Sequence, residues 1–291
     1  MRLDVLRSNL KSMVRTFGLK VTGGQLMNYA AHLYGIQSTY PDRGPGRLLK
    51  IFDNDVFITS YPRSGNTWVR FLLAGLLYPN VQVDYSNVEQ YVPDIYQTNE
   101  LLLRKMSAIR FLKSHEYFDP RYQNIIYIIR NPIDVVSSIF NTLRRLNLNF
   151  RYTSGEFTDR YLDGEFNGSF GAWDEHVNSW TCHEYHKKRF LLIRYEDLYM
   201  DAKGILCKIA DFLGLSLTAS LVDGILLRTT KERMQALYKK TGHQLSCDIG
   251  VFNAGFLEPS SENQSLLEIK DIDRLEKRFY STMVRFGYTL T

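Results

Sequence analysis

The chain has 291 residues, of which 44% are hydrophobic and 23% charged, and its formal net charge at pH 7 is +5. A chain of this length can bury enough apolar surface for one large domain or two small ones. Its composition is that of an ordinary globular protein. The excess of positive charge is small, and the Lys and Arg residues are dispersed, so they do not indicate a nucleic-acid-binding surface. A basic site for a small polyanion explains the charge balance at least as well.

The first 46 residues have the pattern of a helical segment followed by a loop. Apolar residues recur between Leu6 and Phe17 with basic residues among them, and residues 41–46 have the composition of a turn. No apolar run reaches the length of a signal peptide or of a membrane span. We expect residues 1–46 to dock on residues 47–291 as part of one unit; a helix lying on a membrane surface is the alternative.

The cysteines and histidines do not indicate a metal site. Cys182, Cys207 and Cys247 are an odd number with no C-x-x-C spacing, which favours free thiols in a reducing compartment and therefore a cytoplasmic protein. His183 and His186 are three residues apart and could share a metal, but no third ligand is near them. We expect a solvated helix face there and no bound metal.

A strand, a tight polar loop and a helix follow one another within residues 56–77. The β-branched, apolar run ends at Pro62, and a helical pattern begins at Thr67. Such a loop aims several backbone N–H groups at one point, where the helix dipole adds partial positive charge. Gly65 allows a ligand to approach the backbone closely. The sequence therefore predicts a phosphate site. Its candidate residues are Arg63, Ser64, Gly65, Asn66, Thr67 and Trp68.

Further apolar runs at residues 109–113, 125–129 and 190–193 predict three more strands that alternate with helices. The uniformly apolar run 125–129 is expected to be a buried central strand. This alternation predicts an α/β fold, with three layers around a central parallel sheet and a P-loop-like phosphate-binding loop. Active groups then gather at the carboxyl ends of the strands. Helical patterns cover residues 131–143, 173–188, 202–213, 221–227, 232–239 and 269–286.

Residues 61–68, Tyr-Pro-Arg-Ser-Gly-Asn-Thr-Trp, closely resemble a known phosphate loop. The resemblance is to the 5′-phosphosulfate loop, usually T-Y-P-K-S-G-T-T-W, of sulfotransferases that use 3′-phosphoadenosine-5′-phosphosulfate (PAPS). A Walker A motif cannot be written through this segment. The resemblance covers roughly residues 52–288 and implies that PAPS is the co-substrate.

The other elements of this family appear in the same order along the chain. Residues 130–138 resemble the R-N-P-x-D-x-x-x-S element, which implies that Arg130 and Ser138 hold the 3′-phosphate. Lys113-Ser-His115 stands where the family has K-T-H. The resemblance implies that His115 is the general base, since an imidazole titrates near neutrality. It also implies that Lys113 and the loop cation stabilise developing charge.

The adenine contacts are also implied by the resemblance. Tyr195 falls in an L-x-Y-E-D-L-like segment, Trp68 would stack on the ring, and Thr230 begins a segment similar to S-F-x-x-M. Three departures stand out. Arg63 replaces the loop Lys and cannot donate a proton, Lys231 takes the usual Phe position, and the C-terminal R-K-G-x-x-G-x-W segment is not recognisable.

We therefore expect a PAPS-dependent sulfotransferase that acts on a hydroxyl or amine of a small-molecule acceptor, with a natural product preferred. Segments 78–104 and 141–170 match the family poorly and are expected to form the acceptor pocket. A homodimer is left open. One alternative is a P-loop kinase, which would need a Mg²⁺ site. The other is a nucleotide-binding relative that has lost catalysis and binds the desulfonated product, adenosine 3′,5′-bisphosphate (PAP).

Overall fold

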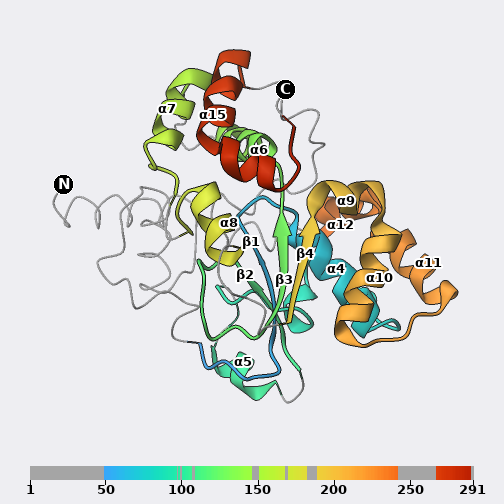
Figure 1. The fold of residues 1–291 in the computed structure, drawn as a ribbon. Helices are drawn as coiled ribbons and strands as arrows, with labels where there is room; N and C mark the ends of the chain where they lie inside the picture. The colour runs from blue at the N-terminus through green and yellow to red at the C-terminus, as the bar shows by residue number, and fades with distance from the viewer. Residues whose placement is uncertain are drawn as a thin grey trace, which may run out of the picture.

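The computed structural model describes residues 49–289, apart from residues 97, 99, 107–108, 146–150, 168–169, 182–188 and 242–266. Within this part of the chain, a four-stranded parallel sheet lies at the centre (Figure 1). Its spatial order is β2-β1-β3-β4, so β3 is a central strand as the sequence predicts. The strands are β1 (Val56–Ser60), β2 (Phe111–Ser114), β3 (Asn124–Ile129) and β4 (Arg189–Arg194).

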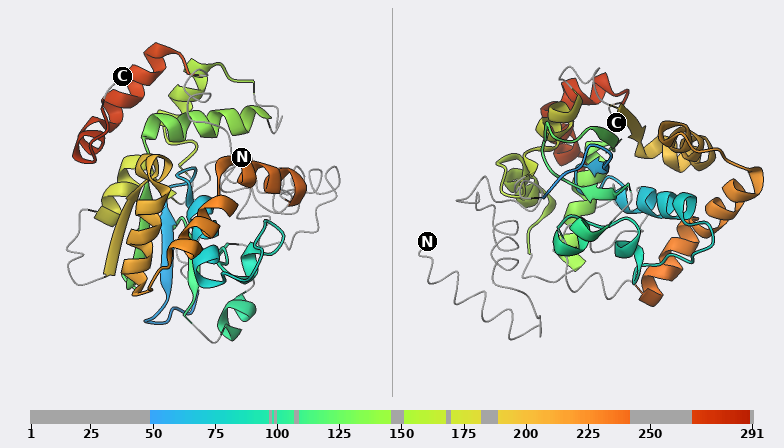
Figure 2. Two further views of the ribbon diagram at one scale, coloured as in Figure 1. Left: turned by 90° about the vertical axis from the view of Figure 1, so that its right-hand side faces the viewer. Right: turned by 90° about the horizontal axis from the view of Figure 1, so that it is seen from below.

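Helices cover both faces of the sheet, which confirms the predicted three-layer α/β fold (Figure 2). The N-terminal segment 1–46, the two histidines considered as metal ligands, and Cys182 and Cys247 lie outside the described residues. The described helices are α4 (Asn66–Leu77), η1 (Val88–Gln90), α5 (Glu100–Lys105), α6 (Pro132–Arg145), α7 (Ser154–Leu162), α8 (Trp173–Thr181), α9 (Tyr195–Met200), α10 (Ala202–Leu213), α11 (Ala219–Arg228), α12 (Lys231–Thr241) and α15 (Ile269–Arg285).

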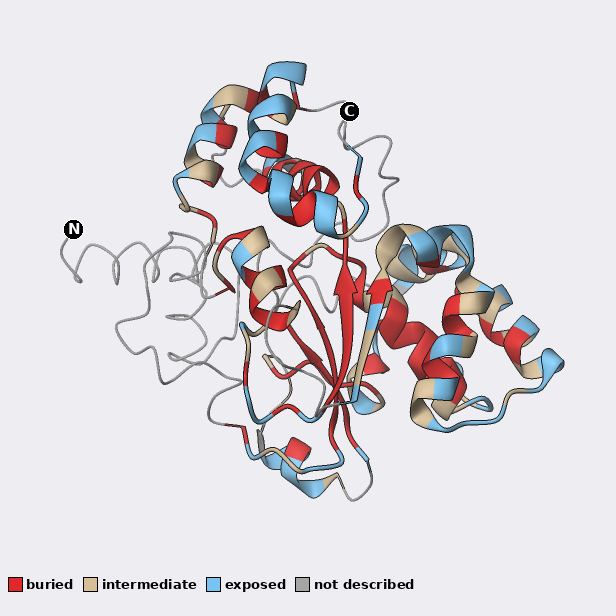
Figure 3. Ribbon diagram, viewed as in Figure 1, coloured by how far each residue is buried: buried red, intermediate tan, exposed pale blue. Residues whose placement is uncertain are grey.

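The two faces of the sheet bury alternate residues of each strand, as the period of two in a β-strand requires. Phe57 and Tyr127 belong to the core shared with α6, α7, α8 and α15. Ile58 and Ile126 belong to the core shared with α4, α10 and α11. Figure 3 shows β1 and β3 buried along their length, while the outward sides of the covering helices are exposed.

The strand register brings the candidate residues to one level of the sheet. Thr59 of β1 pairs with Ser114 of β2, and Ser60 pairs with Ile128 of β3. The loops that follow β1, β2 and β3 therefore begin side by side at the carboxyl edge. In doubly wound sheets this edge is where ligands bind.

The structure differs from the sequence prediction mainly in the poorly matched segments. Residues 78–104 contain η1 and α5, and residues 141–170 contain α7, none of which the apolar periodicity predicts. Helix α7 begins with a capping box, in which Thr153 accepts from the Glu156 backbone and Glu156 accepts in return. This Thr-x-x-Glu spacing is a helix-start signal that was present in the sequence.

Two further observations concern the described part of the chain as a whole. None of its helices is long and apolar enough to cross a membrane. Its His, Cys, Asp and Glu side chains include no group of three or more that could hold a metal ion.

Candidate active site

The loop between β1 and α4 is held in an uncommon backbone conformation. Gly65 has φ +89°, in the left-handed region that glycine adopts without strain. A Cβ atom built on Gly65 would lie 2.3 Å from Cδ2 of Tyr195, so no other residue fits there. Arg63 also has a positive φ, +69°, which is uncommon for a residue with a side chain. The loop is therefore tight where it enters α4, and the Tyr195 ring packs against it at Gly65.

The phosphate loop and the Arg-Asn-Pro element meet directly. Nε of Arg63 donates to Oγ of Ser138 at 2.8 Å, and Nη1 of Arg130 donates to the carbonyl oxygen of Arg63 at 2.9 Å. The Arg130 guanidinium carbon also lies 4.4 Å from the centre of the Tyr195 ring. Two motifs more than sixty residues apart in the sequence thus form one cationic site, made up of the phosphate loop and the Arg130 element.

Several buried polar atoms at this cationic site lack a hydrogen-bond partner within the described structure. They are Oγ of Ser64, Nε1 of Trp68, and Nε and Nη2 of Arg130. The Asp134 carboxylate lies 3.9 Å from Nε of Arg130, beyond hydrogen-bond length. Buried polar groups are nearly always paired. Hydroxyl and guanidinium donors left unpaired beside a helix N-terminus are the donor set that an anionic, multiply phosphorylated ligand requires.

Asn66 contributes to the loop in a different way from its predicted neighbours. Its side-chain nitrogen donates to the carbonyl oxygen of Ile58 at 2.9 Å and lies 3.2 Å from Oγ of Ser60. This nitrogen therefore ties the start of α4 to the end of β1. The backbone N–H, at the first turn of α4, is the group of Asn66 that can face a ligand.

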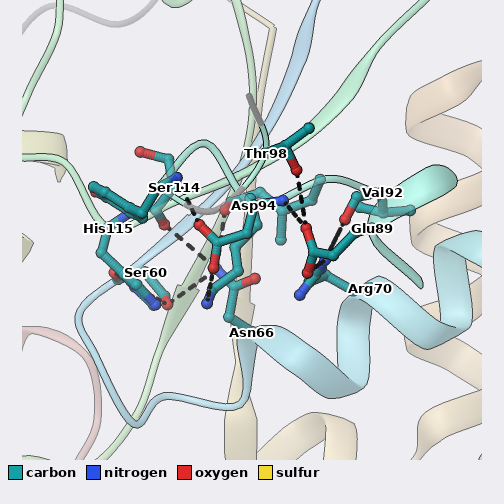
Figure 4. Close-up of polar contacts among 12 residues, drawn as sticks. Ser60, Asn66, Arg70, Glu89, Val92, Asp94, Thr98, Ser114 and His115 are labelled. Carbon is teal, nitrogen blue, oxygen red and sulfur yellow. Dashed lines mark hydrogen bonds and ion pairs between the residues drawn. The ribbon is translucent and has the colours of Figure 1, made fainter. Parts of the chain in front are cut away.

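His115 lies directly after β2 with its tautomer fixed by the protein (Figure 4). Nδ1 lies 2.7 Å from the carbonyl oxygen of Ser60, an atom that can only accept, so the proton is on Nδ1 and the lone pair is on Nε2. The backbone N–H of His115 donates to the Tyr96 hydroxyl at 2.9 Å. Burial, with the nearby Lys113 charge in second place, lowers the pKa of His115 to about 3, so the ring is neutral at neutral pH.

Aromatic rings stand on two sides of His115. The Tyr96 ring is nearly parallel to the imidazole, with centroids 6.3 Å apart, and the Phe170 ring meets it edge-on at 6.0 Å. Tyr96 and Phe170 also contact each other edge-on. Both rings come from the segments that the sequence assigns to the acceptor pocket, and they place flat apolar surface beside the imidazole.

A second histidine, His176 of α8, supports the loop after β2. Its Nε2 lies 3.2 Å from the carbonyl oxygen of His115 and 3.0 Å from that of Glu116, while Nδ1 lies 2.9 Å from the Tyr127 hydroxyl. Burial lowers the pKa of His176 to about 4. The neutral ring thus donates to two carbonyl groups and accepts from the tyrosine. Apolar periodicity along α8 gave no sign of this role.

Lys113 is paired with a carboxylate that sequence reasoning missed. Its Nζ lies 2.7 Å from Oδ2 of Asp94, and both side chains are almost completely buried. Asp94 is nineteen residues earlier, in an irregular segment after η1. No local pattern in the sequence marks it, because the contact depends on how this segment lies against β2.

The structure also places the predicted adenine contacts. Tyr195 begins α9 and packs against Gly65, with its ring 6.2 Å from that of Trp68 in an edge-on arrangement. Oγ1 of Thr230 accepts from the backbone N–H of Arg233 at 3.3 Å, and so caps α12. The three positions remain predicted contacts. Tyr195 and Trp68 lie together at the loop, and Thr230 lies at the start of a separate helix.

The fold and this loop define a protein of the sulfotransferase class. A sequence model of the sulfotransferase domain matches residues 53–263, which is most of the chain, and the chain belongs to that family. It is 29% identical to the rabbit (Oryctolagus cuniculus) amine sulfotransferase over 198 residues, 64% of each protein. It is 30% identical to rat (Rattus norvegicus) sulfotransferase 1A1 over 211 residues, 66% of this chain and 70% of the rat protein. The chain thus spans less than two thirds of the rabbit enzyme.

Solved structures of this class share the fold. A mouse sulfotransferase complexed with PAP superimposes with a TM-score of 0.66 and 22% identity, covering 88% of this chain and 90% of that one. A retinol dehydratase in a complex with retinol and PAP gives a TM-score of 0.65 and 19% identity, covering 90% and 86%. The predicted family and fold class are therefore confirmed.

Proposed function

We propose that this protein transfers a sulfuryl group from PAPS to a hydroxyl or amine of a small-molecule acceptor. The observation that carries this proposal is the convergence of three motifs at the carboxyl edge of the sheet. Arg63 contacts Ser138, Arg130 contacts the Arg63 carbonyl, and His115 directly follows β2 beside β1. Family membership supports this activity over that of a P-loop kinase.

In this proposal, different residues of the chain bind different parts of the cofactor. The loop N–H groups, Ser64, Thr67 and Arg63 would hold the 5′-phosphosulfate, and Arg130 and Ser138 would hold the 3′-phosphate. The unpaired donors of Ser64 and Arg130 fit these roles. Trp68, Tyr195 and Thr230 are the proposed adenine contacts. When bound, PAPS supplies the sulfuryl group and a phosphate leaving group. The protein functions in this proposal without a metal.

His115 is the proposed general base. Since Nδ1 donates to the Ser60 carbonyl, Nε2 is left to take the proton of the acceptor. A pKa of about 3 makes the ring a weak base in the free protein. Anionic phosphate groups beside it would raise this pKa toward neutrality, because they favour the imidazolium form. The base thus gains strength when the nucleotide is in place.

Charge stabilisation falls to Arg63, Lys113 and the loop N–H groups. Arg63 reaches from the phosphate loop to Ser138, the residue proposed to hold the 3′-phosphate. Fixed donors of this kind stabilise charge without reorganising during the reaction, which makes them effective in a site that excludes water.

For the acceptor, we propose a small molecule with a flat apolar face, and we prefer a natural product. The rings of Tyr96 and Phe170 beside His115 support this, since aromatic walls favour such a face. The name of the rabbit relative, an amine sulfotransferase, keeps amines among the acceptors to be tested.

We further propose a cytoplasmic protein in which residues 1–46 and 47–291 form one unit. The free thiol of Cys207 supports a reducing compartment. Cell fractionation tests the location, and a lower melting temperature after removal of residues 1–46 tests the single unit. Chromatography at several protein concentrations tests for a homodimer.

Nucleotide selectivity tests the proposed function directly. PAP should raise the melting temperature, by the equivalent of about 2.7 kcal/mol at a hundredfold excess over Kd, while ATP with Mg²⁺ should raise it much less. In the variant Arg130→Ala, PAP should bind about 2–5 kcal/mol more weakly, the cost of removing one partner of a buried charged contact. Binding of adenosine 5′-phosphosulfate, which lacks the 3′-phosphate, should scarcely change.

Equal weakening of both ligands would show that Arg130 supports the fold and does not recognise the 3′-phosphate. A turnover screen with PAPS and several acceptor classes, read by mass, separates the enzyme from a non-catalytic relative. The non-catalytic relative would bind PAP and give no sulfated product.

A further inference from the structure

The short segment 93–96 runs along β2 and contacts the two residues that carry the proposed chemistry. Lys113 N–H donates to the carbonyl oxygen of Pro93 at 2.8 Å, and Ile95 N–H donates to the carbonyl oxygen of Lys113 at 3.2 Å. Asp94 and Lys113 thereby form a parallel bridge, which points their side chains toward the same face of the sheet. The backbone pairing sets the distance between carboxylate and ammonium.

The Asp94 side chain is itself held on more than one side (Figure 4). Its Oδ1 accepts from the Tyr96 backbone N–H at 3.0 Å, and its own N–H donates to Oε2 of Glu89 at 2.6 Å. Oε1 of Glu89 pairs with Nη2 of Arg70 at 2.6 Å. Two cations and two anions alternate here, so the cluster is neutral although it is mostly buried.

Burial disfavours charge, so a buried ammonium group needs a counter-ion close to it. Burial also opposes the charge on Asp94, but Lys113, Arg70 and the hydrogen bonds outweigh it, and the pKa of Asp94 is lowered. The Asp94 side chain is therefore a carboxylate at neutral pH. The charged or titratable side chains around the pair include His115 directly after β2, Tyr96 on the adjoining segment, Arg70 on α4 and Glu89 on η1.

We propose that Asp94 is a positioning residue for sulfuryl transfer, which keeps Lys113 charged and aims it at the phosphate loop. This inference rests on the proposed function. The same segment positions the base, because the Tyr96 hydroxyl accepts from the His115 backbone N–H. Segment 93–96 thus contacts both groups: Asp94 pairs with the ammonium of Lys113, and Tyr96 fixes the backbone of His115.

The test is the pH dependence of kcat in the variant Asp94→Asn. Without the carboxylate, the buried amine is more stable neutral, and its charge is lost as pH rises. We expect kcat to fall roughly tenfold at pH 7 and about 10²-fold at pH 9, the scale of removing one electrostatic stabiliser. The wild type should show no such alkaline decline. Adding Lys113→Arg to Asp94→Asn should abolish the decline, because a guanidinium stays charged.

The matched control is Asp55→Asn, which removes the carboxylate of another buried ion pair, with Arg110, at the opposite end of the same two strands. It should lower the melting temperature and leave the shape of the pH profile unchanged. A PAP-induced rise in melting temperature shows that each variant is folded.

An unchanged pH profile in Asp94→Asn would overturn the inference and leave the proposed function standing. Absence of any PAPS turnover by the wild type would overturn the proposed function and the inference together. If Asp94→Asn does not fold, the wild-type profile decides. An alkaline decline below about pH 9 that Lys113→Arg removes would show that Asp94 does not keep Lys113 charged.

Discussion

The two ends of the β1–β2 pair each bury an ion pair, but the two pairs use different cations. At the amino end, Arg110 holds Asp55 through two bonds, of 2.8 Å from Nε and 2.5 Å from Nη2. At the carboxyl end, Lys113 holds Asp94 through one bond of 2.7 Å. All four side chains are almost completely removed from water. In both pairs, a buried cation is neutralised by a buried carboxylate.

The two cations differ in whether they can lose a proton and in how freely their side chains can reorient. The remaining donors of Arg110 go to the carbonyl oxygens of Leu103 and Lys50, and its guanidinium lies 4.4 Å from the centre of the Phe52 ring. A guanidinium does not lose its proton in proteins. An amine can lose its proton, and its flexible stem lets it reorient. The Arg110 pair thus lies at the amino end of the strands, and the Lys113 pair lies at the carboxyl end, where we propose that the nucleotide binds.

The comparison predicts that chemistry is confined to the carboxyl end. His115→Ala should lower kcat by about 10²–10⁴, the usual cost of losing a general base. PAP affinity should stay nearly unchanged, because Nε2 faces the acceptor and not the nucleotide. Single-turnover assays and calorimetry measure the two quantities. A variant that retained most of its turnover would place the base elsewhere and break the comparison at its catalytic end.

The sequence was sufficient where structure depends on local backbone. The strand, the loop with Gly65 and the start of α4 are contiguous, and so is the Arg130 element, so their positions could be predicted from the sequence. Alternating strands and helices then determined the layers. The register of parallel strands brought these motifs together at one edge, as the fold class implies.

Sequence reasoning failed where function depends on distant pairing. Asp94 meets Lys113 through a bridge to the neighbouring strand, and His176 meets carbonyl groups about sixty residues earlier in the chain. In the sequence, an aspartate after a proline and a histidine on an amphipathic helix look like ordinary solvated or core residues. Only the packing of their segments against β2 gives them a partner.

At the amino end, the comparison predicts a loss of stability without a loss of catalysis. Arg110→Met leaves the Asp55 carboxylate buried and unpaired, which should lower the free energy of unfolding by about 3–5 kcal/mol. Turnover per folded molecule should be unchanged. Urea denaturation and kcat, corrected for the folded fraction, check both statements. Arg110→Lys is the milder control, since it keeps the charge and loses the two-bond geometry and the bonds to the Leu103 and Lys50 carbonyl groups. A fall in corrected kcat would show that this end also serves the reaction.

The smallest expected effect concerns the two buried histidines, His115 and His176. They should make the free energy of unfolding depend on pH in a range where the other groups at either end of the strands contribute little. Burial lowers the pKa of His115 to about 3 and that of His176 to about 4, both below the ordinary value of 6.5. The unfolded chain therefore binds more protons than the native protein between about pH 4 and 6.5. Stability due to these residues is complete above pH 6.5 and is lost as pH falls, by up to about 1.4 kcal/mol per pH unit for each histidine.

The window from pH 6.5 to 5 isolates this effect, because most carboxylates scarcely titrate there. Asp94, with its lowered pKa, should contribute only at more acid pH. In His176→Gln the slope of unfolding free energy against pH should fall by about half, since one of the two buried imidazoles is gone. Urea denaturation at several pH values measures it. A flat wild-type profile would mean that both imidazoles take up protons in the native protein, so that Nε2 of His115 is not held as a free base. A slope that the variant leaves unaltered would mean that His176 alone does so.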